Sequence, residues 1–348
     1  MNIITIVGAR PQFIKAAAVM HVYAQNRLLH TGQHYDYNMS EAFFNELHLP
    51  APQWNLDCRN NDPDMTTKIQ AILQAEKPDV IIVFGDTYST LCGARAAKLA
   101  GINVAHIEAG LRSFNDSMPE EYNRIETDKI AQYLFCPTHT AVKNLQAEGI
   151  TNNVFLVGDV MYDAALRFTP NEEEQAQILN SLHITAKQYY LATIHRADTA
   201  DSPAKIESIF RALQALDKDV IVPLHPHTAK TIAENTTLQD LLKASPSIRI
   251  IDPVGYRQML SLEKNALVIL TDSGGVQKEA YFQRTPCVTL RNETEWTETV
   301  NAGWNRLAGT DTDRIIKACT TPFNGSEIAE YGDGKAAERI IQHLLDKQ

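Results

Sequence analysis

Residues 270–280 read LTDSGGVQKEA, and this stretch indicates how the chain is built. It follows the apolar run Ala266–Leu270, which is typical of a strand buried inside a parallel sheet. It leads into Val276–Ala280, which predicts the first turns of a helix. Two adjacent glycines let the backbone approach a ligand closely, and the free N–H groups of a helix start favour an anion. The stretch therefore predicts a strand–loop–helix unit with an anion-binding loop.

The same strand–helix alternation runs through the whole chain of 348 residues. Several of the short apolar runs are apolar throughout, as expected when helices cover both faces of a parallel sheet. The expected strands of the first half are Ile3–Val7, Leu28–Thr31, Val80–Phe84, Val104–Ile107, Tyr133–Cys136 and Val154–Val157. Those of the second half are Tyr190–Ile194, Val220–Leu224, Ile248–Ile251, Leu267–Leu270 and Cys287–Leu290. This alternation favours an α/β fold of the doubly wound type.

A break in the alternation separates two halves of similar size. Pro170 follows a short helical segment, and the acidic run at residues 172–174 begins a polar helix. We therefore expect two Rossmann-like domains, residues 1–168 and 169–348, facing each other across a cleft. A closing helix is expected over residues 334–346, and its packing back onto the first domain is left open. Ligands of such folds bind beyond the carboxyl ends of the strands, so chemistry is expected there.

The composition indicates which classes of partner the chain is not suited to bind. The net charge is −10 and no basic run occurs, which argues against nucleic acid and anionic membrane as partners. The longest apolar stretches have the length of strands, and the N-terminus MNIITIVGAR lacks the features of a signal peptide. Five cysteines without a C-x-x-C pair suit reduced thiols. We expect a cytoplasmic protein.

Several strand ends of the first half carry groups suited to chemistry. Residues 8–15 (GARPQFIK) offer Arg10 and Lys15 to an anion, although an ordinary turn with exposed charges explains them equally well. Asp86 follows an apolar strand, where the commoner explanation is a helix cap. Glu108 ends the next strand, where capping is a poor explanation. Glu120 opens a helix behind a proline, and compensation of the helix dipole is its simpler interpretation.

The second half adds histidines to the anion loop. His195 and His225 follow successive strands, and contact with phosphate or proton transfer suits them better than a metal site. Ser273 can cap the helix and also donate to an oxygen. Glu279, farther along the same helix, can bind a ribose diol. A nucleotide-diphosphate site together with carboxylates at the other strand ends indicates acid/base chemistry on a sugar.

The motifs resemble those of a known family. They are GARPQFIKA, TGQHYD, GDTYST, HIEAGLRS, MPEEYNR, LFCPT, VGDVMYDA, HRAD, PLHPHT, DPVGY, TDSGGVQKEA and the YGDGKAAERI tail, which together resemble the non-hydrolysing UDP-N-acetylglucosamine 2-epimerases. The resemblance extends over essentially the whole chain and in order. It implies a GT-B fold, domain closure on binding and a homodimer.

The resemblance also implies a reaction. The family interconverts UDP-N-acetylglucosamine (UDP-GlcNAc) and UDP-N-acetylmannosamine (UDP-ManNAc) without a cofactor or a metal. A base removes the C2 proton while UDP leaves C1, and a 2-acetamidoglucal forms. C2 is then reprotonated on its other face and UDP adds back to C1. Such a route needs placed carboxylates and stabilisation of the departing diphosphate.

Roles are carried over by motif from the family. Asp86, Glu108 and Glu120 match its acid/base carboxylates, and which one removes the proton stays open. His195 matches a histidine needed for catalysis. The positions that match substrate and diphosphate contacts are Arg10, Lys15, His225, Ser273, Gly274 and Gly275, and Glu279 matches the ribose ligand. Gln33 and His34, in the TGQH segment, are candidates for a site at which UDP-GlcNAc acts as an allosteric activator.

Two positions depart from the family pattern. Gln12 stands where many members have glutamate, and Trp296 stands where many carry an arginine that contacts the sugar nucleotide. The chain also resembles a branch that acts on UDP-2,3-diacetamido-2,3-dideoxyglucuronic acid. A sugar that carries a carboxylate would need an extra cation near C6 of the sugar. The sequence does not reveal such a cation clearly, so UDP-GlcNAc is favoured over this acid.

More distant alternatives involve other classes of protein. A GT-B glycosyltransferase would not need three carboxylates around C2 and would present a membrane-docking face. A non-catalytic UDP-sugar sensor would tolerate the loss of those carboxylates, yet all three are present. A hydrolysing epimerase is a closer rival whose motifs match less well.

Overall fold

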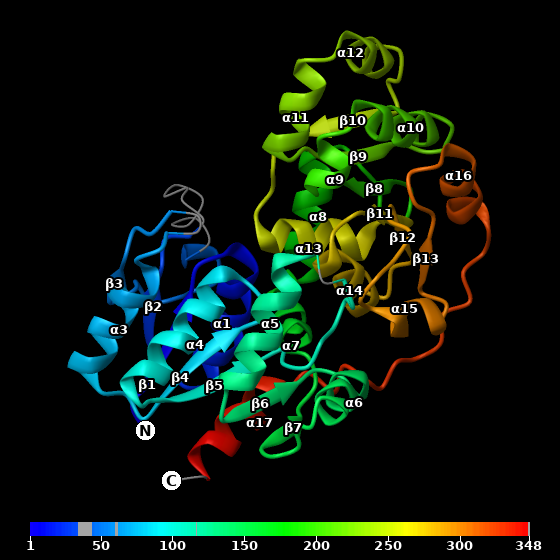
Figure 1. Ribbon diagram of the computed structural model, residues 1–348. Coiled ribbons are helices and arrows are strands. Elements are labelled where there is room, and N and C mark those ends of the chain that lie inside the picture. Colours follow the sequence, from blue (N-terminus) through cyan, green and yellow to red (C-terminus); the bar gives the residue numbers. More distant parts are fainter. Residues whose placement is uncertain (34–43, 60–61, 116, 347–348) are drawn as a thin grey trace. The chain divides into compact units, whose positions relative to one another are not determined.

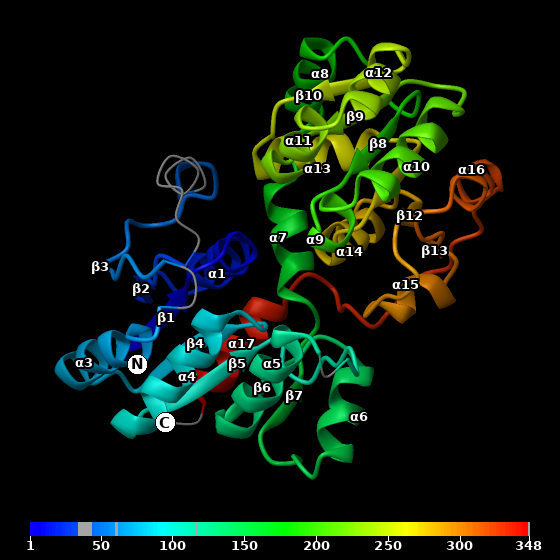
Figure 2. The ribbon, with the colours of Figure 1, turned by 45° about the horizontal axis from the view of Figure 1, so that its top comes forward.

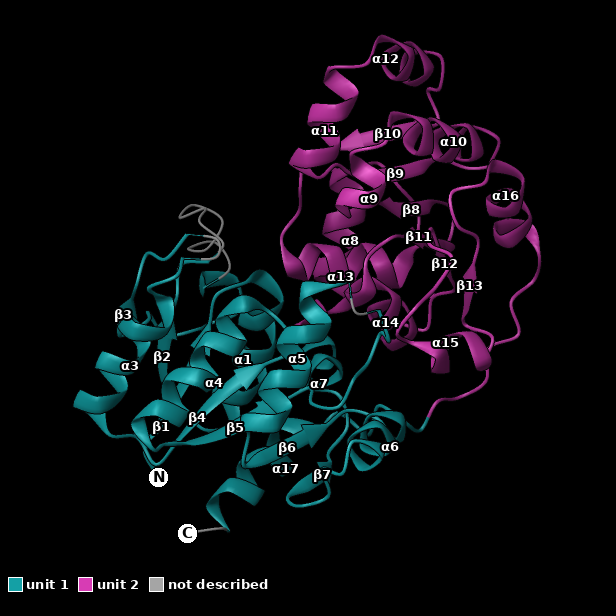
Figure 3. Cartoon of the chain, viewed as in Figure 1, with its two compact units in different colours: residues 1–167, 329–348 teal, residues 168–328 magenta. Residues whose placement is uncertain are grey.

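The computed structural model describes residues 1–33, 44–59, 62–115 and 117–346. The chain divides into two compact units, Met1–Arg167 with Ala329–Gln348, and Phe168–Ile328 (Figure 3). The second unit is therefore shorter than residues 169–348, because the C-terminal segment groups with the first unit. Among the described residues, no helix has the length and apolar character needed to span a membrane.

The first unit contains a parallel sheet in the order β3-β2-β1-β4-β5-β6-β7 (Figure 1). Its strands are β1 (Ile3–Val7), β2 (Arg27–His30), β3 (Trp54–Asn55), β4 (Val80–Phe84), β5 (Asn103–Ile107), β6 (Tyr133–Cys136) and β7 (Val154–Leu156). Its helices are α1 (Arg10–Val22), α3 (Met65–Glu76), α4 (Tyr88–Ala100), α5 (Pro119–Ile130), α6 (His139–Ala147), α7 (Val160–Phe168) and α17 (Ala336–Leu345). The helix α7 ends at the boundary with the second unit.

The last helix, α17, packs against the first unit (Figure 2). It contacts α1, and the ring of its His343 stacks on Phe155 of β7 with 4.3 Å between ring centroids. Asp163 of α7 accepts hydrogen bonds from the amides of Ala336 and Ala337 at the start of α17. The C-terminal segment thus completes the core of a unit that begins more than three hundred residues earlier.

The second unit contains a parallel sheet in the order β10-β9-β8-β11-β12-β13. Its strands are β8 (Tyr190–Thr193), β9 (Val220–Pro223), β10 (Ile248–Ile251), β11 (Val268–Thr271), β12 (Cys287–Thr289) and β13 (Asn305–Leu307). Its helices are α8 (Glu172–Ser181), α9 (Ala197–Ala200), α10 (Pro203–Gln214), α11 (Pro226–Ala233), α12 (Thr236–Lys243), α13 (Tyr256–Asn265), α14 (Gly274–Phe282), α15 (Thr297–Asn301) and α16 (Thr312–Thr320).

All eleven predicted strands are present, with each end within one residue of its predicted position. They were recognisable because β1, β4, β8, β9 and β11 are buried along their whole length, which requires apolar side chains on both faces. Two strands, β3 and β13, were not predicted; both are short edge strands that contain asparagine.

Both sheets have the strand order of a Rossmann fold, so the predicted α/β class with two Rossmann-like units is confirmed. The order reverses between β1 and β4 in the first unit and between β8 and β11 in the second. The loops at the carboxyl ends of these four strands are the places where such sheets bind ligands.

Candidate active site

Two carboxylates of the first unit share one arginine. Asp86 follows β4 and Glu108 follows β5, and these strands pair in parallel, with Phe84 opposite Ile107. Arg124 of α5 donates a short hydrogen bond to the Asp86 carboxylate and another to the Glu108 carbonyl, and its Nη2 lies 3.5 Å from Glu108 Oε1. Burial disfavours the charged guanidinium, but the two carboxylates outweigh it and raise the pKa of Arg124.

Glu108 itself is held in an unusual conformation. Its φ of +70° is left-handed, a region that a side chain other than glycine rarely adopts. Its carboxylate is nearly buried and pairs with Lys15 of α1, with 2.6 Å between Nζ and Oε2. Gly85 leaves room for this pair, since a Cβ there would lie 3.3 Å from Glu108 Oε1. Strain retained at a charged strand end favours a functional role over a structural one.

The explanation of Asp86 as a helix cap is wrong. The N-cap of α4 is Thr87, whose side chain accepts the amide of Thr90, so Asp86 does not cap the helix. Its carbonyl accepts from Asn123, and its carboxylate is one-third exposed. The side chain is thus anchored by α5 and still reachable from solvent.

The two glutamates at the start of α5 have different environments. Glu121 is buried, and its carboxylate accepts from the amide and hydroxyl of Ser113 and from the amide of Phe114. Glu120 is exposed, and its carboxylate has no hydrogen bond or ion pair with any residue that the structure describes. Glu121 therefore holds a loop in place, whereas Glu120 is available to a ligand.

A second buried network lies behind these carboxylates. His106 of β5 and Asp128 of α5 are fully buried, with 2.7 Å between Nδ1 and Oδ1. The other ring nitrogen of His106 lies 2.7 Å from the Gly85 carbonyl oxygen. The ring of His106 thus connects the Asp128 carboxylate to the Gly85 carbonyl. Burial works to raise the pKa of Asp128, but the charges of His106 and Arg112 lower it below its usual range.

The loop after β1 lies close to this network. Arg10 is the first residue of α1, and Lys15 pairs with Glu108 as described above. Gln12 is buried; its Oε1 accepts the amides of Gly8 and Ala9, and its Nε2 donates to the carbonyl of Phe84. A carboxylate could not donate that last bond. Gln12, at which the chain departs from the family pattern, therefore connects the end of β1 to the end of β4 through hydrogen bonds of its side chain.

The candidate effector residues are only partly described. The Oε1 of Gln33 accepts from the amide and hydroxyl of Ser89 at the start of α4. His34 lies outside the described residues. The role of both in activation stays a prediction.

The two candidate histidines of the second unit lie side by side. His195 follows β8, and its ring centroid is 5.8 Å from that of His225, the N-cap of α11. His225 Nδ1 accepts the amide of His227, so its Nε2 carries the proton in the neutral ring. His195 Nδ1 lies 3.0 Å from Oδ1 of Asp272, which is fully buried. No group of His, Cys, Asp or Glu side chains suited to a metal ion occurs in the described ranges.

The two glycines at the start of α14 differ in what surrounds them. A Cβ on Gly274 would lie 2.3 Å from Oε1 of Glu295, so an alanine there would require the end of that side chain to shift. A Cβ on Gly275 would meet only the hydroxyl of Ser273, at 3.9 Å. Gly275 is exposed, and its φ is not in the left-handed region. The packing of the chain itself therefore does not require glycine at position 275, and its role in binding a diphosphate stays a prediction.

The hydroxyl of the N-cap residue of α14 is not used by the helix itself. Ser273 occupies this position as predicted, but its hydroxyl does not bond to the helix, so the expected side-chain cap is absent. Gly275 and Glu279 are four residues apart and lie on one face of α14, separated by about 6 Å along its axis. That spacing suits a phosphate at the helix start and a sugar diol one turn further on.

The neighbouring face of α14 is covered by residues 291–296. Lys278 is buried and its ammonium lies 3.9 Å from the ring centroid of Trp296. Arg291 Nη1 lies 3.1 Å from Glu295 Oε2, which holds Glu295 beside Gly274. Trp296, where many family members have arginine, thus packs as an aromatic face on a lysine.

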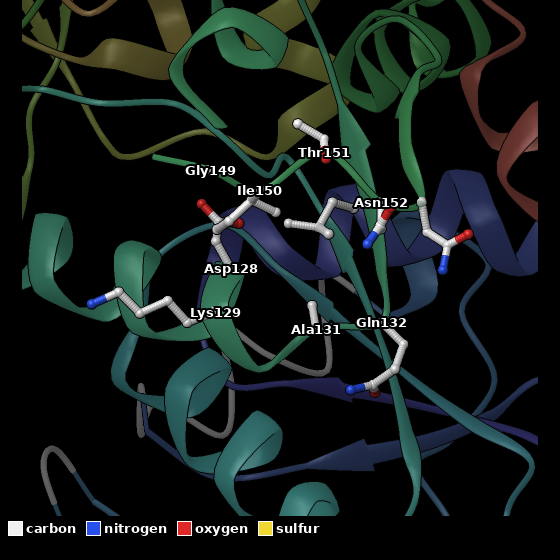
Figure 4. A pocket seen from close by; sticks show the side chains of 10 residues that line it. Asp128, Lys129, Ala131, Gln132, Gly149, Ile150, Thr151 and Asn152 are labelled. Atoms are coloured by element: carbon white, nitrogen blue, oxygen red, sulfur yellow. The ribbon is translucent and has the colours of Figure 1, made fainter. Parts of the chain in front are cut away.

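One pocket of about 340 Å³ lies elsewhere in the first unit (Figure 4). It is lined by Gln132 and Asn153, which precede β6 and β7. It therefore lies at the amino ends of β6 and β7, whereas Asp86 and Glu108 follow the carboxyl ends of β4 and β5 in the same parallel sheet. We assign it no part in the site.

A profile of the family described as UDP-N-acetylglucosamine 2-epimerase matches residues 17–345. The chain belongs to this family. A UDP-N-acetylglucosamine 2-epimerase homolog of Methanococcus maripaludis is 46% identical, over 99% of each chain. The UDP-2,3-diacetamido-2,3-dideoxy-D-glucuronate 2-epimerase of Pseudomonas aeruginosa is 43% identical, over 99% of each chain. The crystal structure of the Methanocaldococcus jannaschii UDP-GlcNAc 2-epimerase with UDP-GlcNAc and UDP has a TM-score of 0.89 at 41% identity, covering 99% of this chain and 100% of that one.

Several residues that contact the candidate residues within each unit were not singled out from the sequence. They are Arg124, His106, Asp128 and Asp272, all of which are buried. A polar residue within an apolar run was a usable signal for His106, which sits between Ala105 and Ile107. Arg124 lies four residues after Glu120, a spacing that also occurs in ordinary surface pairs, so its role as a bridge required the tertiary structure.

Proposed function

We propose that this chain is a non-hydrolysing epimerase that interconverts UDP-GlcNAc and UDP-ManNAc. The second unit binds UDP, with the diphosphate at Ser273 and Gly275 and the ribose at Glu279. The first unit supplies the carboxylates Asp86, Glu108 and Glu120, which move the C2 proton. The observation that carries the proposal is the strained, nearly buried carboxylate of Glu108 between Lys15 and Arg124.

The chemistry follows from these groups. One carboxylate removes the C2 proton as the C1–O bond breaks, and the bonding electrons go to the β-phosphate oxygen. The resulting 2-acetamidoglucal and UDP stay bound, C2 takes a proton on its other face, and UDP adds back at C1. Each of these two carboxylates has a cation beside it, Arg124 at Asp86 and Lys15 at Glu108, and an ionised carboxylate at a strand end can act as a general base. The amides at the start of α14 and the donors around them stabilise the departing diphosphate.

Solvent isotope exchange tests this reaction. Incubation of either UDP-sugar in deuterated water should give product labelled at C2, followed by NMR. Glu108→Gln should abolish epimerisation and leave the dissociation constant of UDP within about threefold, because removal of a base affects the chemical step. Glu76→Gln, which removes a carboxylate from a partly exposed ion pair with Arg27, is the control. Unlabelled product at equilibrium would contradict the mechanism.

The identity of the sugar in the substrate is a separate point, with UDP-GlcNAc and the diacetamido-glucuronate as the two candidates. The relative that acts on the diacetamido-glucuronate and the structural neighbour that acts on UDP-GlcNAc are 43% and 41% identical, which does not discriminate. UDP-GlcNAc is favoured because Lys15 and Arg124, the two cations beside the candidate carboxylates, are already paired with them. An NMR assay offering both UDP-sugars separately decides this point, and turnover of the diacetamido-glucuronate alone would reverse the choice.

Assembly and regulation belong to the same proposal. We expect a cytoplasmic homodimer that is activated by UDP-GlcNAc, as the family resemblance implies. Light scattering after gel filtration measures the assembly. Addition of UDP-GlcNAc to a reaction started with UDP-ManNAc measures activation, which would appear as a shortened lag.

A further inference from the structure

Asp272 is a buried carboxylate that the proposed reaction has not used. It follows β11 and directly precedes Ser273. Its side chain has no exposed surface. Both carboxylate oxygens lie 3.1 Å from the amide nitrogen of His195, Oδ2 accepts the amide of Arg196 at 3.0 Å, and Oδ1 lies 3.0 Å from His195 Nδ1. A single carboxylate thus holds both the backbone and the ring of His195.

The contact with the ring determines its tautomer. An ionised carboxylate only accepts hydrogen bonds, so Nδ1 of His195 must carry the proton that it shares with Asp272. The remaining ring nitrogen, Nε2, makes no hydrogen bond with the described part of the chain, and the side chain is 41% exposed. Nε2 is therefore the atom that His195 offers to a ligand.

The surrounding sheet keeps this pair next to the anion loop. The strands that carry the two residues are neighbours, with Thr193 opposite Thr271. The hydroxyls of these threonines lie 2.7 Å apart in the buried sheet. The residue after Asp272 is the N-cap of α14, so movement of the carboxylate would displace the loop and the histidine together.

We propose that Asp272 is a positioning residue that holds His195 with Nε2 directed at the departing diphosphate. This inference rests on the proposed epimerase function and deepens it. As the C1–O bond breaks, its electrons pass to the β-phosphate oxygen, and His195, protonated on both ring nitrogens, keeps its Nδ1–H on Asp272 and donates a hydrogen bond from Nε2–H to that phosphate. The proton stays on the ring, and the carboxylate of Asp272 balances the imidazolium. When UDP adds back to C1, the same hydrogen bond weakens again.

The competing interpretation is that Asp272 only anchors the backbone of residues 195 and 196. A double-mutant cycle separates the two, because only the positioning role requires the ring of His195. Asp272→Asn should lower kcat about 100-fold, since a neutral amide neither balances the charge of the imidazolium nor accepts its Nδ1–H as strongly as a carboxylate does. The dissociation constant of UDP should change less than about threefold. In the His195→Gln background, Asp272→Asn should lower kcat less than about threefold further.

Losses of kcat that multiply across the cycle would overturn the proposal, as would an Asp272→Asn variant with kcat within about threefold of wild type. Asp201→Asn is the matched control, because Asp201 pairs with the exposed His227 at 2.6 Å outside the proposed site. It should leave kcat unchanged.

A measurement on the wild-type chain covers the case in which Asp272→Asn does not fold. Nitrogen-15 NMR of the histidine rings, assigned with His195→Gln, should show a proton on Nδ1 of His195 at neutral pH. A ring with a bare Nδ1 would overturn the proposal. If wild type binds UDP but epimerises neither sugar, the proposed function fails, while the ring measurement still decides whether Asp272 orients His195.

Discussion

The ring of His106 and the carboxylate of Asp128 form an ion pair from which solvent is excluded on both sides. The same ring reaches the Gly85 carbonyl next to Asp86, and the same carboxylate accepts the amide of Gly110, two residues after Glu108. This pair therefore links the two loops that carry the candidate acid/base groups. It contacts neither reacting atoms nor solvent, so its effect on chemistry is through position.

We expect Asp128→Asn to lower the free energy of unfolding by about 3–5 kcal/mol, because it removes the carboxylate partner of the buried His106 and one of the two carboxylate partners of Arg112, which keeps Glu148. Urea denaturation followed by circular dichroism measures this. The control is Glu126→Gln on the same helix, which breaks a partly exposed pair with Lys129 and should cost at most about 0.5 kcal/mol. Equal losses in the two variants would contradict the assignment of a buried ion pair.

The glycines of α14 should respond differently to alanine. Gly275→Ala adds a methyl group in open space, so stability should stay the same or rise by up to about 1 kcal/mol, while UDP binds at least about tenfold more weakly. Gly274→Ala forces Glu295 to move and should lower the melting temperature. Calorimetric titration with UDP and thermal unfolding measure both variants. Normal UDP affinity in Gly275→Ala would exclude the diphosphate from this position.

The adjacent glutamates of α5 provide a matched pair. Glu120→Gln should lower kcat about 100-fold or more and change the free energy of unfolding by less than about 0.5 kcal/mol, because its carboxylate is exposed. Glu121→Gln should cost about 1–3 kcal/mol, since an amide NH₂ would face the N–H groups of the loop at Ser113 and Phe114. A stable, fully active Glu120→Gln variant would remove Glu120 from the mechanism.

The attachment of α17 should depend on pH. Burial raises the pKa of Asp163 from 3.8 to about 6, although the amides of Ala336 and Ala337 lower it. The folded chain therefore binds this proton more tightly than the unfolded chain, and the resulting stability is lost as pH rises. The difference in unfolding free energy between wild type and Asp163→Asn should fall between about pH 4 and pH 6 and level off above about pH 7.

Urea denaturation of both proteins at several pH values measures this difference. A difference that is constant across that range, or that rises with pH, would contradict the raised pKa.

Much of the fold could be predicted because parallel strands have a simple signature. A strand covered on both faces must be apolar along its length, as in Val80–Phe84, and such runs are visible without any tertiary information. The same logic pointed to Asp86, Glu108, His195 and Ser273, since each lies within three residues of the end of a predicted strand. It failed for β13, because a short edge strand with asparagine and arginine has neither the length nor the composition of that signature.

The sequence by itself determined the fold class, the family and the strand ends at which chemistry is expected, because these depend on local patterns and ordered motifs. Only the tertiary structure distinguished the environments of residues that are neighbours in the sequence. It separated Glu120 from Glu121 and Gly274 from Gly275, and it showed Arg124 between two carboxylates. Adjacent residues have nearly the same sequence context, but backbone direction turns one inward and the other outward. Contacts between helix α5 and the ends of β4 and β5 span up to 38 residues, so no local pattern encodes them.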